Sequence, residues 1–115
     1  MAYQWPFKDP DETLDYSVDW SRFLGSATIL SVVWSVKTPA YTTETVLESG
    51  EDLTTATGGE VTDSIQNVSQ TNTSTVATIN IGSGVTNREY TFFCTITDST
   101  GSTAKRSIKL KVRDR

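Results

Sequence analysis

Histidine is absent from this chain of 115 residues, and cysteine occurs once, as Cys94. The sequence therefore lacks the commonest general base and metal ligand, and it can form no Ser-His or Cys-His nucleophile pair. A single cysteine excludes a disulfide within the chain, and we expect Cys94 to be a small buried hydrophobe in an alternating run. These absences argue against an enzyme. We predict no catalytic residue, no metal site and no cofactor.

Long hydrophobic runs and helical periodicity are missing as well. No stretch approaches the roughly 18 apolar residues that a membrane-spanning helix needs, and the first residues lack the apolar run of a signal peptide. We therefore expect a protein made in a cytoplasm and without a membrane partner. The length predicts one domain.

The chain does contain short runs rich in Thr, Val and Ile, in which apolar and polar residues alternate. Leu14, Tyr16, Val18 and Trp20 alternate with acids and serines, which is the pattern of a strand with one buried face. Comparable runs cover residues 28–36, 74–81, 90–97 and 104–113, and weaker strands are predicted at 40–48, near 53 and at 61–68. About seven short strands predict an all-β fold, an immunoglobulin-like β-sandwich over residues 13–115. Residues 1–12 precede it as an N-terminal arm and turn.

Some positions within these strands have predicted places. Trp34 and Tyr90 stand where immunoglobulin-like folds often keep a core tryptophan and a corner tyrosine. In the strand at 28–36, Leu30 shares the inward face with Val32, Trp34 and Val36. Ile29 and Val33 on the opposite face predict that this second face is partly covered.

Charge is unevenly distributed within a net value of −4. The acids Asp9, Asp11, Glu12 and Asp15 are hard-cation ligands by type, but their spacing matches no calcium loop, so a solvated turn is favoured. A basic stripe on the last strand is typical either of a nucleic-acid surface or of a strand edge protected by lysines. It consists of Lys105, Lys109, Lys111 and Arg113. Because the net charge is negative and no nucleic-acid module is present, we expect no nucleic-acid partner.

Two alternatives concern the acidic first strand and the basic last strand. Asp15 and Asp19 could face Lys109 and Lys111 within one chain, or they could face a neighbouring copy and set the register of an assembly. The arm offers a similar choice, because its aromatic residues either fold back over the core or anchor the chain in a partner. The predicted interface residues are Tyr3, Trp5, Phe7, Asp15, Asp19, Lys109, Lys111 and Arg113.

Three segments resemble small virion proteins of tailed phages, the fiber–tail adaptor family. They are KDPDETLDYSVDWS at 8–21, SVVWSV at 31–36 and EYTFFCTITDSTGSTAKRSIKLKVRD at 89–114. The resemblance implies a non-enzymatic structural component of a phage particle, an adaptor that joins tail or fiber components. The particle is expected to be assembled in the cytoplasm of a bacterial host. It implies other virion proteins of the tail, fiber or capsid as partners, and self-association in a symmetric assembly.

Two other functions remain open. One is a capsid decoration protein on the phage head. The other is a carbohydrate- or receptor-binding module, for which Trp5 and Tyr41 are the candidate exposed aromatics.

Overall fold

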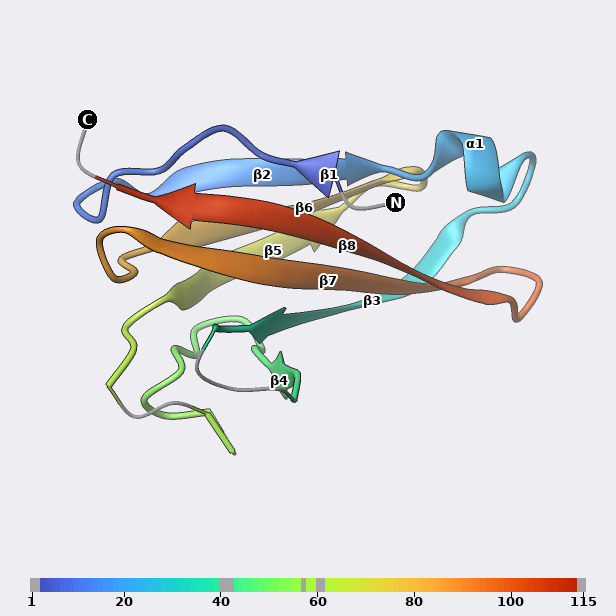
Figure 1. Cartoon of the computed structure of the whole chain (residues 1–115). Helices are drawn as coiled ribbons and strands as arrows, with labels where there is room; N and C mark the ends of the chain where they lie inside the picture. The colour runs from blue at the N-terminus through green and yellow to red at the C-terminus, as the bar shows by residue number, and fades with distance from the viewer. Residues whose placement is uncertain (1–2, 40–42, 57, 60–61, 114–115) are drawn as a thin grey trace.

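The chain folds into two packed β-sheets (Figure 1). A computed structural model describes residues 3–39, 43–56, 58–59 and 62–113, and only the backbone of residues 3 and 4. The larger sheet has the strand order β1 (Tyr3–Gln4), β8 (Thr103–Val112), β7 (Arg88–Asp98), β3 (Ile29–Lys37), β4 (Thr45–Val46). The smaller sheet has the order β2 (Leu14–Asp19), β6 (Val76–Gly82), β5 (Gln66–Asn72). The predicted all-β class and the sandwich are confirmed.

The hairpin of β7 and β8 follows the predicted alternation closely. Tyr90, Phe92, Cys94 and Ile96 of β7 are buried, as expected for the inward positions of a strand. Asp98 orders the hairpin loop, because its carboxylate accepts the backbone N–H groups of residues 100 and 102 at 2.9 and 3.0 Å. The prediction that Cys94 is buried and unpaired is confirmed.

The strand β2 also has the predicted inward face. Tyr16, Val18 and Trp20 are buried, and β2 pairs antiparallel with β6. The predicted turn after β2 is a single helical turn, α1 (Ser21–Leu24), whose Leu24 is buried. Gly25 ends it with a φ of 60°, a left-handed conformation that glycine adopts without strain.

The strand β3 departs from the predicted faces at its first residues. A bulge lies between Ile29 and Ser31, where the pairing with β7 shifts register. Ile29 is consequently buried and Leu30 is 67% exposed, so the prediction that Leu30 points inward is wrong. One inserted residue reverses which side of the sheet each following side chain occupies. Val33 on the outer face is exposed as well.

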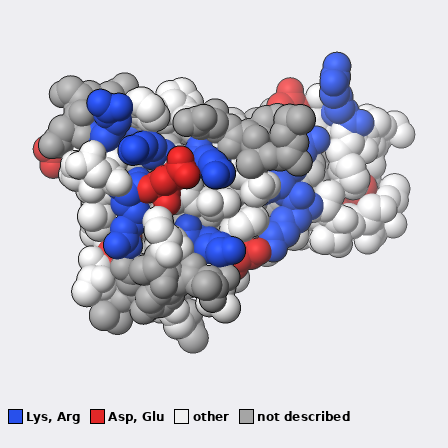
Figure 2. Space-filling view, in the orientation of Figure 1, with Lys and Arg blue, Asp and Glu red and all other residues white. Residues whose placement is uncertain are grey.

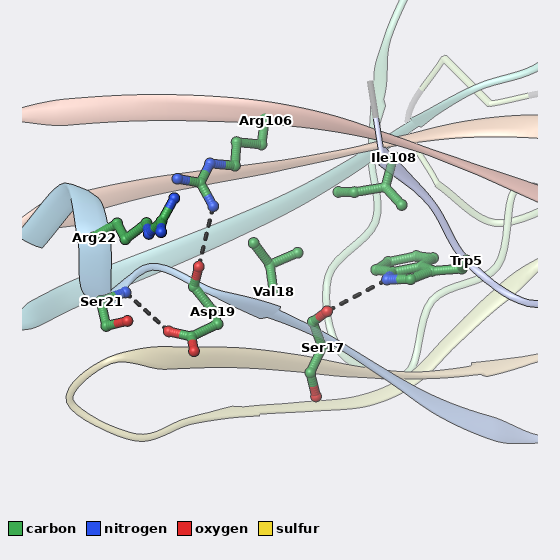
Figure 3. A pocket seen from close by; sticks show the side chains of 8 residues that line it. All are labelled: Trp5, Ser17, Val18, Asp19, Ser21, Arg22, Arg106 and Ile108. Carbon is green, nitrogen blue, oxygen red and sulfur yellow. Dashed lines mark hydrogen bonds between the residues drawn. The ribbon is translucent and has the colours of Figure 1, made fainter. Parts of the chain in front are cut away.

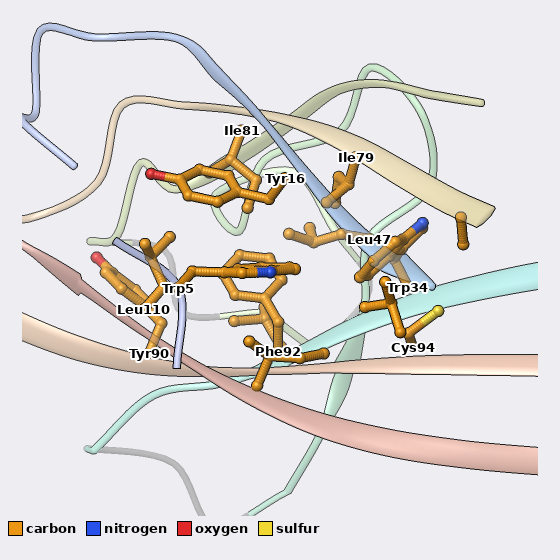
Figure 4. Close-up of a cluster of buried hydrophobic side chains, with 14 of the residues drawn as sticks. Trp5, Tyr16, Trp34, Leu47, Ile79, Ile81, Tyr90, Phe92, Cys94 and Leu110 are labelled. Carbon is orange, nitrogen blue, oxygen red and sulfur yellow. The ribbon is translucent and has the colours of Figure 1, made fainter. Parts of the chain in front are cut away.

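The N-terminal arm is part of the larger sheet. Its strand β1 runs parallel to β8, with Tyr3 opposite Ile108. Beyond β1, the backbone N–H of Trp5 donates to the carbonyl of Lys109 at 2.9 Å. The indole of Trp5 is buried and stacks on Tyr16 with ring centroids 4.8 Å apart (Figure 4). The structure therefore places Trp5 inside the core of its own chain.

The polar stretch between β4 and β5 also contributes to the core. Leu47, Leu53 and Ile65 lie outside regular strands and are nevertheless buried. An isolated bridge joins residues 52 and 66 in this stretch. Of the strand predicted at 61–68, residue 61 lies outside the described residues and 62–65 are irregular, so β5 begins at Gln66. The strand predicted at 40–48 is represented by the two residues of β4, and Tyr41 lies outside the described residues.

Candidate interaction surface

The opening motif KDPDE begins with a buried lysine. The Lys8 ammonium donates to the backbone carbonyls of Ser83 at 2.5 Å and Asp9 at 2.9 Å. Burial lowers the pKa of Lys8, and the nearby charges of Glu12, Asp9 and Asp11 act in the opposite direction. The Lys8 backbone pairs with the end of β8. Its N–H donates to the carbonyl of Lys111, and its carbonyl accepts the N–H of Arg113. Lys8 thus attaches the end of the arm to the sandwich.

The next four residues form a compact acidic turn, Asp9–Glu12. The Asp9 N–H donates to the Glu12 carboxylate and the Asp11 N–H to the Asp9 carboxylate, each at 2.9 Å. The backbone N–H of Glu12 closes the turn on the carbonyl of Asp9 at 3.0 Å. The Asp11 side chain stays exposed. Within the described part of the chain, no group of acids is placed to hold a metal ion.

A groove opens at the side of the sandwich, where β2 and β8 belong to different sheets and diverge. It encloses about 410 Å³ between the middle of β2, α1 and β8 (Figure 3). Its apolar wall consists of Trp5, Val18 and Ile108, and its polar wall of Asp19, Ser21, Arg22 and Arg106. Ser17, beside Trp5, lines it as well. The indole N–H of Trp5 donates to the Ser17 carbonyl at 3.3 Å. We call this cavity the lateral groove.

Arg106 is held in a fixed position at the polar wall. Its guanidinium lies 4.4 Å from the ring centre of Trp20 and donates to the Asp19 carbonyl at 3.0 Å. The Asp19 carboxylate accepts the backbone N–H of Ser21 at 2.9 Å. This bond, with the positive charge of Arg106, lowers the pKa of Asp19, which is therefore ionised at neutral pH.

Arg22 gives the lateral groove its unbalanced charge. It is exposed on α1 and forms no ion pair with any carboxylate among the described residues. With one carboxylate and two guanidinium groups, the polar wall carries a net positive charge. Anionic groups are the complementary ligands of such a wall, and arginine binds carboxylates with two parallel hydrogen bonds.

The within-chain pairing of Asp15 and Asp19 with Lys109 and Lys111 is not formed. Because β2 and β8 lie in different sheets, these side chains have other neighbours. Asp15 accepts a hydrogen bond from Asn80 on β6 at 2.6 Å, and Lys109 lies 3.6 Å from Glu89 on β7. Figure 2 shows basic side chains spread along this face of the molecule with acidic ones among them. The alternative role of these residues, contact with a neighbouring copy, stays a prediction.

The predicted aromatic interface residues are separated by the structure. Trp5 is 9% exposed and Phe7 is 38% exposed, with the Arg113 guanidinium 5.0 Å from the Phe7 ring centre. The side chain of Tyr3 lies outside the described residues. The interface role of these three residues also stays a prediction.

Sequence reasoning missed the residues that shape the lateral groove, Arg22 and Arg106. A signal existed for Arg106, because it occupies an inward position of β8 between Ala104 and Ile108, where a charge is unusual. No pattern in the sequence marks Arg22, which reaches the groove only because β2 is followed by a helical turn.

A second groove lies on the opposite side of the sandwich. It encloses about 350 Å³ between β3, the segment 46–49 and Gln70 of β5. Val33 and Val46 line it and are 45% and 49% exposed.

Among the residues that the structure describes, no helix has the length and apolar character of a membrane span.

The described residues thus form a two-layer β-sandwich with a groove along each side. Residues 8–62 match the family described as podophage GP4 fiber-tail adaptor protein gp77, so the predicted resemblance to the phage fiber–tail adaptor family is confirmed. The family name indicates a structural, non-enzymatic role as a component of the phage particle. The match starts at Lys8 and includes the acidic turn, β2 and α1. No curated protein matches the chain.

Proposed function

We propose that this chain is a non-enzymatic adaptor module that joins tail and fiber components of a phage particle. The match of residues 8–62 to the fiber–tail adaptor family carries the proposal. The matched segment supplies the acidic turn at one end of the sandwich and Asp19, Ser21 and Arg22 of the lateral groove. The family signature therefore coincides with surface features suited to contact with other proteins.

The immunoglobulin-like character is part of the same proposal. In immunoglobulin domains, one sheet contains the strands B, E and D side by side and the other contains G, F and C. The orders β2-β6-β5 and β8-β7-β3 follow this scheme when the strands are counted along the chain. Trp34 on β3 and Tyr90 on β7 are both buried, which supports the correspondence.

The partners in this proposal are other virion proteins and further copies of the chain in a symmetric array, assembled in the bacterial cytoplasm. An adaptor needs at least two contact surfaces. The described residues offer candidates on both sides of the sandwich, the lateral groove and the groove lined by Val33 and Val46.

Particles made in the absence of this protein provide the test. We expect such particles to lack fibers and to regain them when the purified protein is added, as seen by electron microscopy and infectivity. The copy number per restored particle separates the alternatives, since a tail ring contains few copies and a decorated head contains hundreds. Fibers that attach equally well without the protein, or a copy number close to that of the major capsid protein, would contradict the adaptor function.

A further inference from the structure

We infer that the lateral groove receives the acidic turn Asp9–Glu12 of a second copy of this chain, so that copies join head to tail. This inference deepens the proposed self-association and rests on it. The two surfaces have opposite charge and lie at different places along the molecule. Each can therefore be occupied by a neighbour while the fold of each copy stays intact.

The groove supplies the receiving half of the contact. Trp5, Val18 and Ile108 form an apolar wall, and Arg22 stands opposite with no ion pair among the described residues. Arg106 is already held by Trp20 and the Asp19 carbonyl, so little side-chain entropy is lost when an anion binds beside it. A ligand with one small apolar group and one carboxylate fits both walls.

The acidic turn supplies such a ligand. Pro10 provides the apolar group and Asp11 an exposed carboxylate. The hydrogen bonds between Asp9 and Glu12 and between Asp11 and Asp9 hold the turn in one conformation before any contact is made. The buried Lys8 attaches it to the sandwich. The turn is thus held in one conformation, with the Asp11 carboxylate exposed at its surface.

The positions of the two surfaces exclude their meeting within one copy. The turn precedes the first residue of β2, and the groove lies along the second half of β2 and α1, toward the other end of the sandwich (Figure 1). A contact between unlike surfaces of identical chains is heterologous, and repeated contacts of this kind close into a ring or extend as a filament. Head-to-tail joining through this contact is therefore suited to a symmetric collar of copies.

Two charge reversals test the contact. Arg22→Glu reverses the charge of the groove arginine that forms no ion pair among the described residues, and Asp11→Lys reverses the charge at the tip of the turn. Lys37→Glu on β3 and Glu51→Lys in the segment after β4 serve as matched controls. They make the same changes of charge at residues that line neither the lateral groove nor the groove of Val33 and Val46. Circular dichroism melts establish that each variant is folded, and sedimentation velocity measures the oligomeric state.

We expect the wild type and both controls to self-associate with rising concentration, and to do so less in high salt because the contact is ionic. Each of the two reversals alone gives monomers. An equal mixture of Arg22→Glu and Asp11→Lys restores association, because the intact turn of the first variant meets the intact groove of the second.

Three results would overturn the inference: a wild type that remains monomeric up to about 1 mM, reversals that associate as the wild type does, or a mixture that stays monomeric. Restoration of fibers on deficient particles is scored separately for each variant. A wild type that forms oligomers but restores no fibers would contradict the adaptor function and leave the contact between copies standing.

Discussion

At the scale of single residues, the most consequential group is the buried carboxylate of Asp63. It is fully buried and accepts hydrogen bonds from the Ile65 backbone N–H and the Tyr90 hydroxyl, and it pairs with Arg88 at 2.9 Å. A buried carboxylate is tolerated only with such donors, since desolvation of an unpaired charge is costly. These bonds attach the irregular segment before β5 to the start of β7.

Replacement of Asp63 by Ala should therefore destabilise the protein strongly. We expect a loss of about 3 kcal/mol or more in the free energy of unfolding, because Arg88 and Tyr90 both lose their hydrogen bond to this buried carboxylate. Asp63→Asn keeps an acceptor for Tyr90 and should cost less. Urea unfolding of the two variants measures the difference. Equal stabilities of the wild type and Asp63→Ala would show that the network contributes nothing.

The second residue-scale prediction concerns alkaline pH. Burial raises the pKa of Tyr90, and the charge of Asp63 adds to the shift. Its folded pKa thus lies above the unfolded value of about 10, so the unfolded state loses this proton first and stability falls as pH rises above about 10. The loss is at most about 1.4 kcal/mol per pH unit for one group. Burial also raises the pKa of Cys94, to about 11, which adds a smaller loss above pH 9.

Urea unfolding at pH values from 8 to 11 measures this dependence. In Tyr90→Phe the fall in stability above pH 10 should be shallower than in the wild type. Cys94→Ala provides the comparison for the thiol. A Tyr90→Phe variant with the wild-type slope would assign the alkaline loss to other groups.

At the scale of elements, the short N-terminal arm contributes a buried tryptophan to the core. Trp5 packs against Tyr16, Trp34 and Phe92 at ring-centroid distances of 4.8, 6.0 and 5.9 Å. Aromatic side chains bury large areas, and offset or tilted pairs add to that contribution. The arm therefore completes the core that the sandwich strands leave open on one side.

We predict that Trp5→Ala lowers the free energy of unfolding by about 3–5 kcal/mol, as for other buried tryptophans. Phe7→Ala, two residues further along the same arm, should cost much less because Phe7 is 38% exposed. Guanidinium unfolding followed by circular dichroism compares the two. A Trp5→Ala variant with wild-type stability would mean that the arm is free of the core in solution and open to a partner.

The strands that could be predicted from sequence are those with a clear local pattern. In β2, β6, β7 and β8, a buried face alternates with a polar one, so periodicity alone places the inward side chains. The pattern fails at Leu30, because a bulge is a feature of pairing with β7 and leaves no mark in the sequence of β3. It fails again at β5, whose polar sequence carries no apolar alternation.

The strand pairing of the arm and the position of the groove could not be predicted from the sequence, for a different reason. The parallel pairing of β1 with β8 joins residues at opposite ends of the chain, and no local pattern in residues 1–7 indicates such a partner. Arg22 and Arg106 meet at the lateral groove only once two sheets have packed. The absence of histidine argued against an enzyme, and the resemblance to the adaptor family implied a structural role. The positions of the contact surfaces depend on the packing of the sheets.

At the scale of the whole molecule, the charges on the outer face of β8 contribute little to folding. Lys109 and Glu89 are both about half exposed and lie 3.6 Å apart, and exposed ion pairs contribute about 0–1 kcal/mol. Lys109 is therefore available for contact with other proteins, because the fold does not depend on its ion pair.

We predict that the double variant Lys109→Glu, Lys111→Glu unfolds within about 1 kcal/mol of the wild type. Its binding to fiberless particles, compared with the wild type by co-sedimentation, then reports on the interface alone. Reduced binding with unchanged stability supports the predicted interface role of these lysines. Unchanged binding removes them from the contact surface.

The pairing of β1 with β8 also bears on how the protein is made. The two strands are separated by about a hundred positions in the chain, so the ribosome releases the arm long before it releases the strand that the arm binds. Until β8 emerges, Trp5 has neither its backbone partner nor a complete cavity, and a large aromatic surface stays open to solvent. Completion of the core is therefore a late step of biosynthesis, and a truncated product ending before β8 would expose this tryptophan to aggregation or to proteolysis in the host.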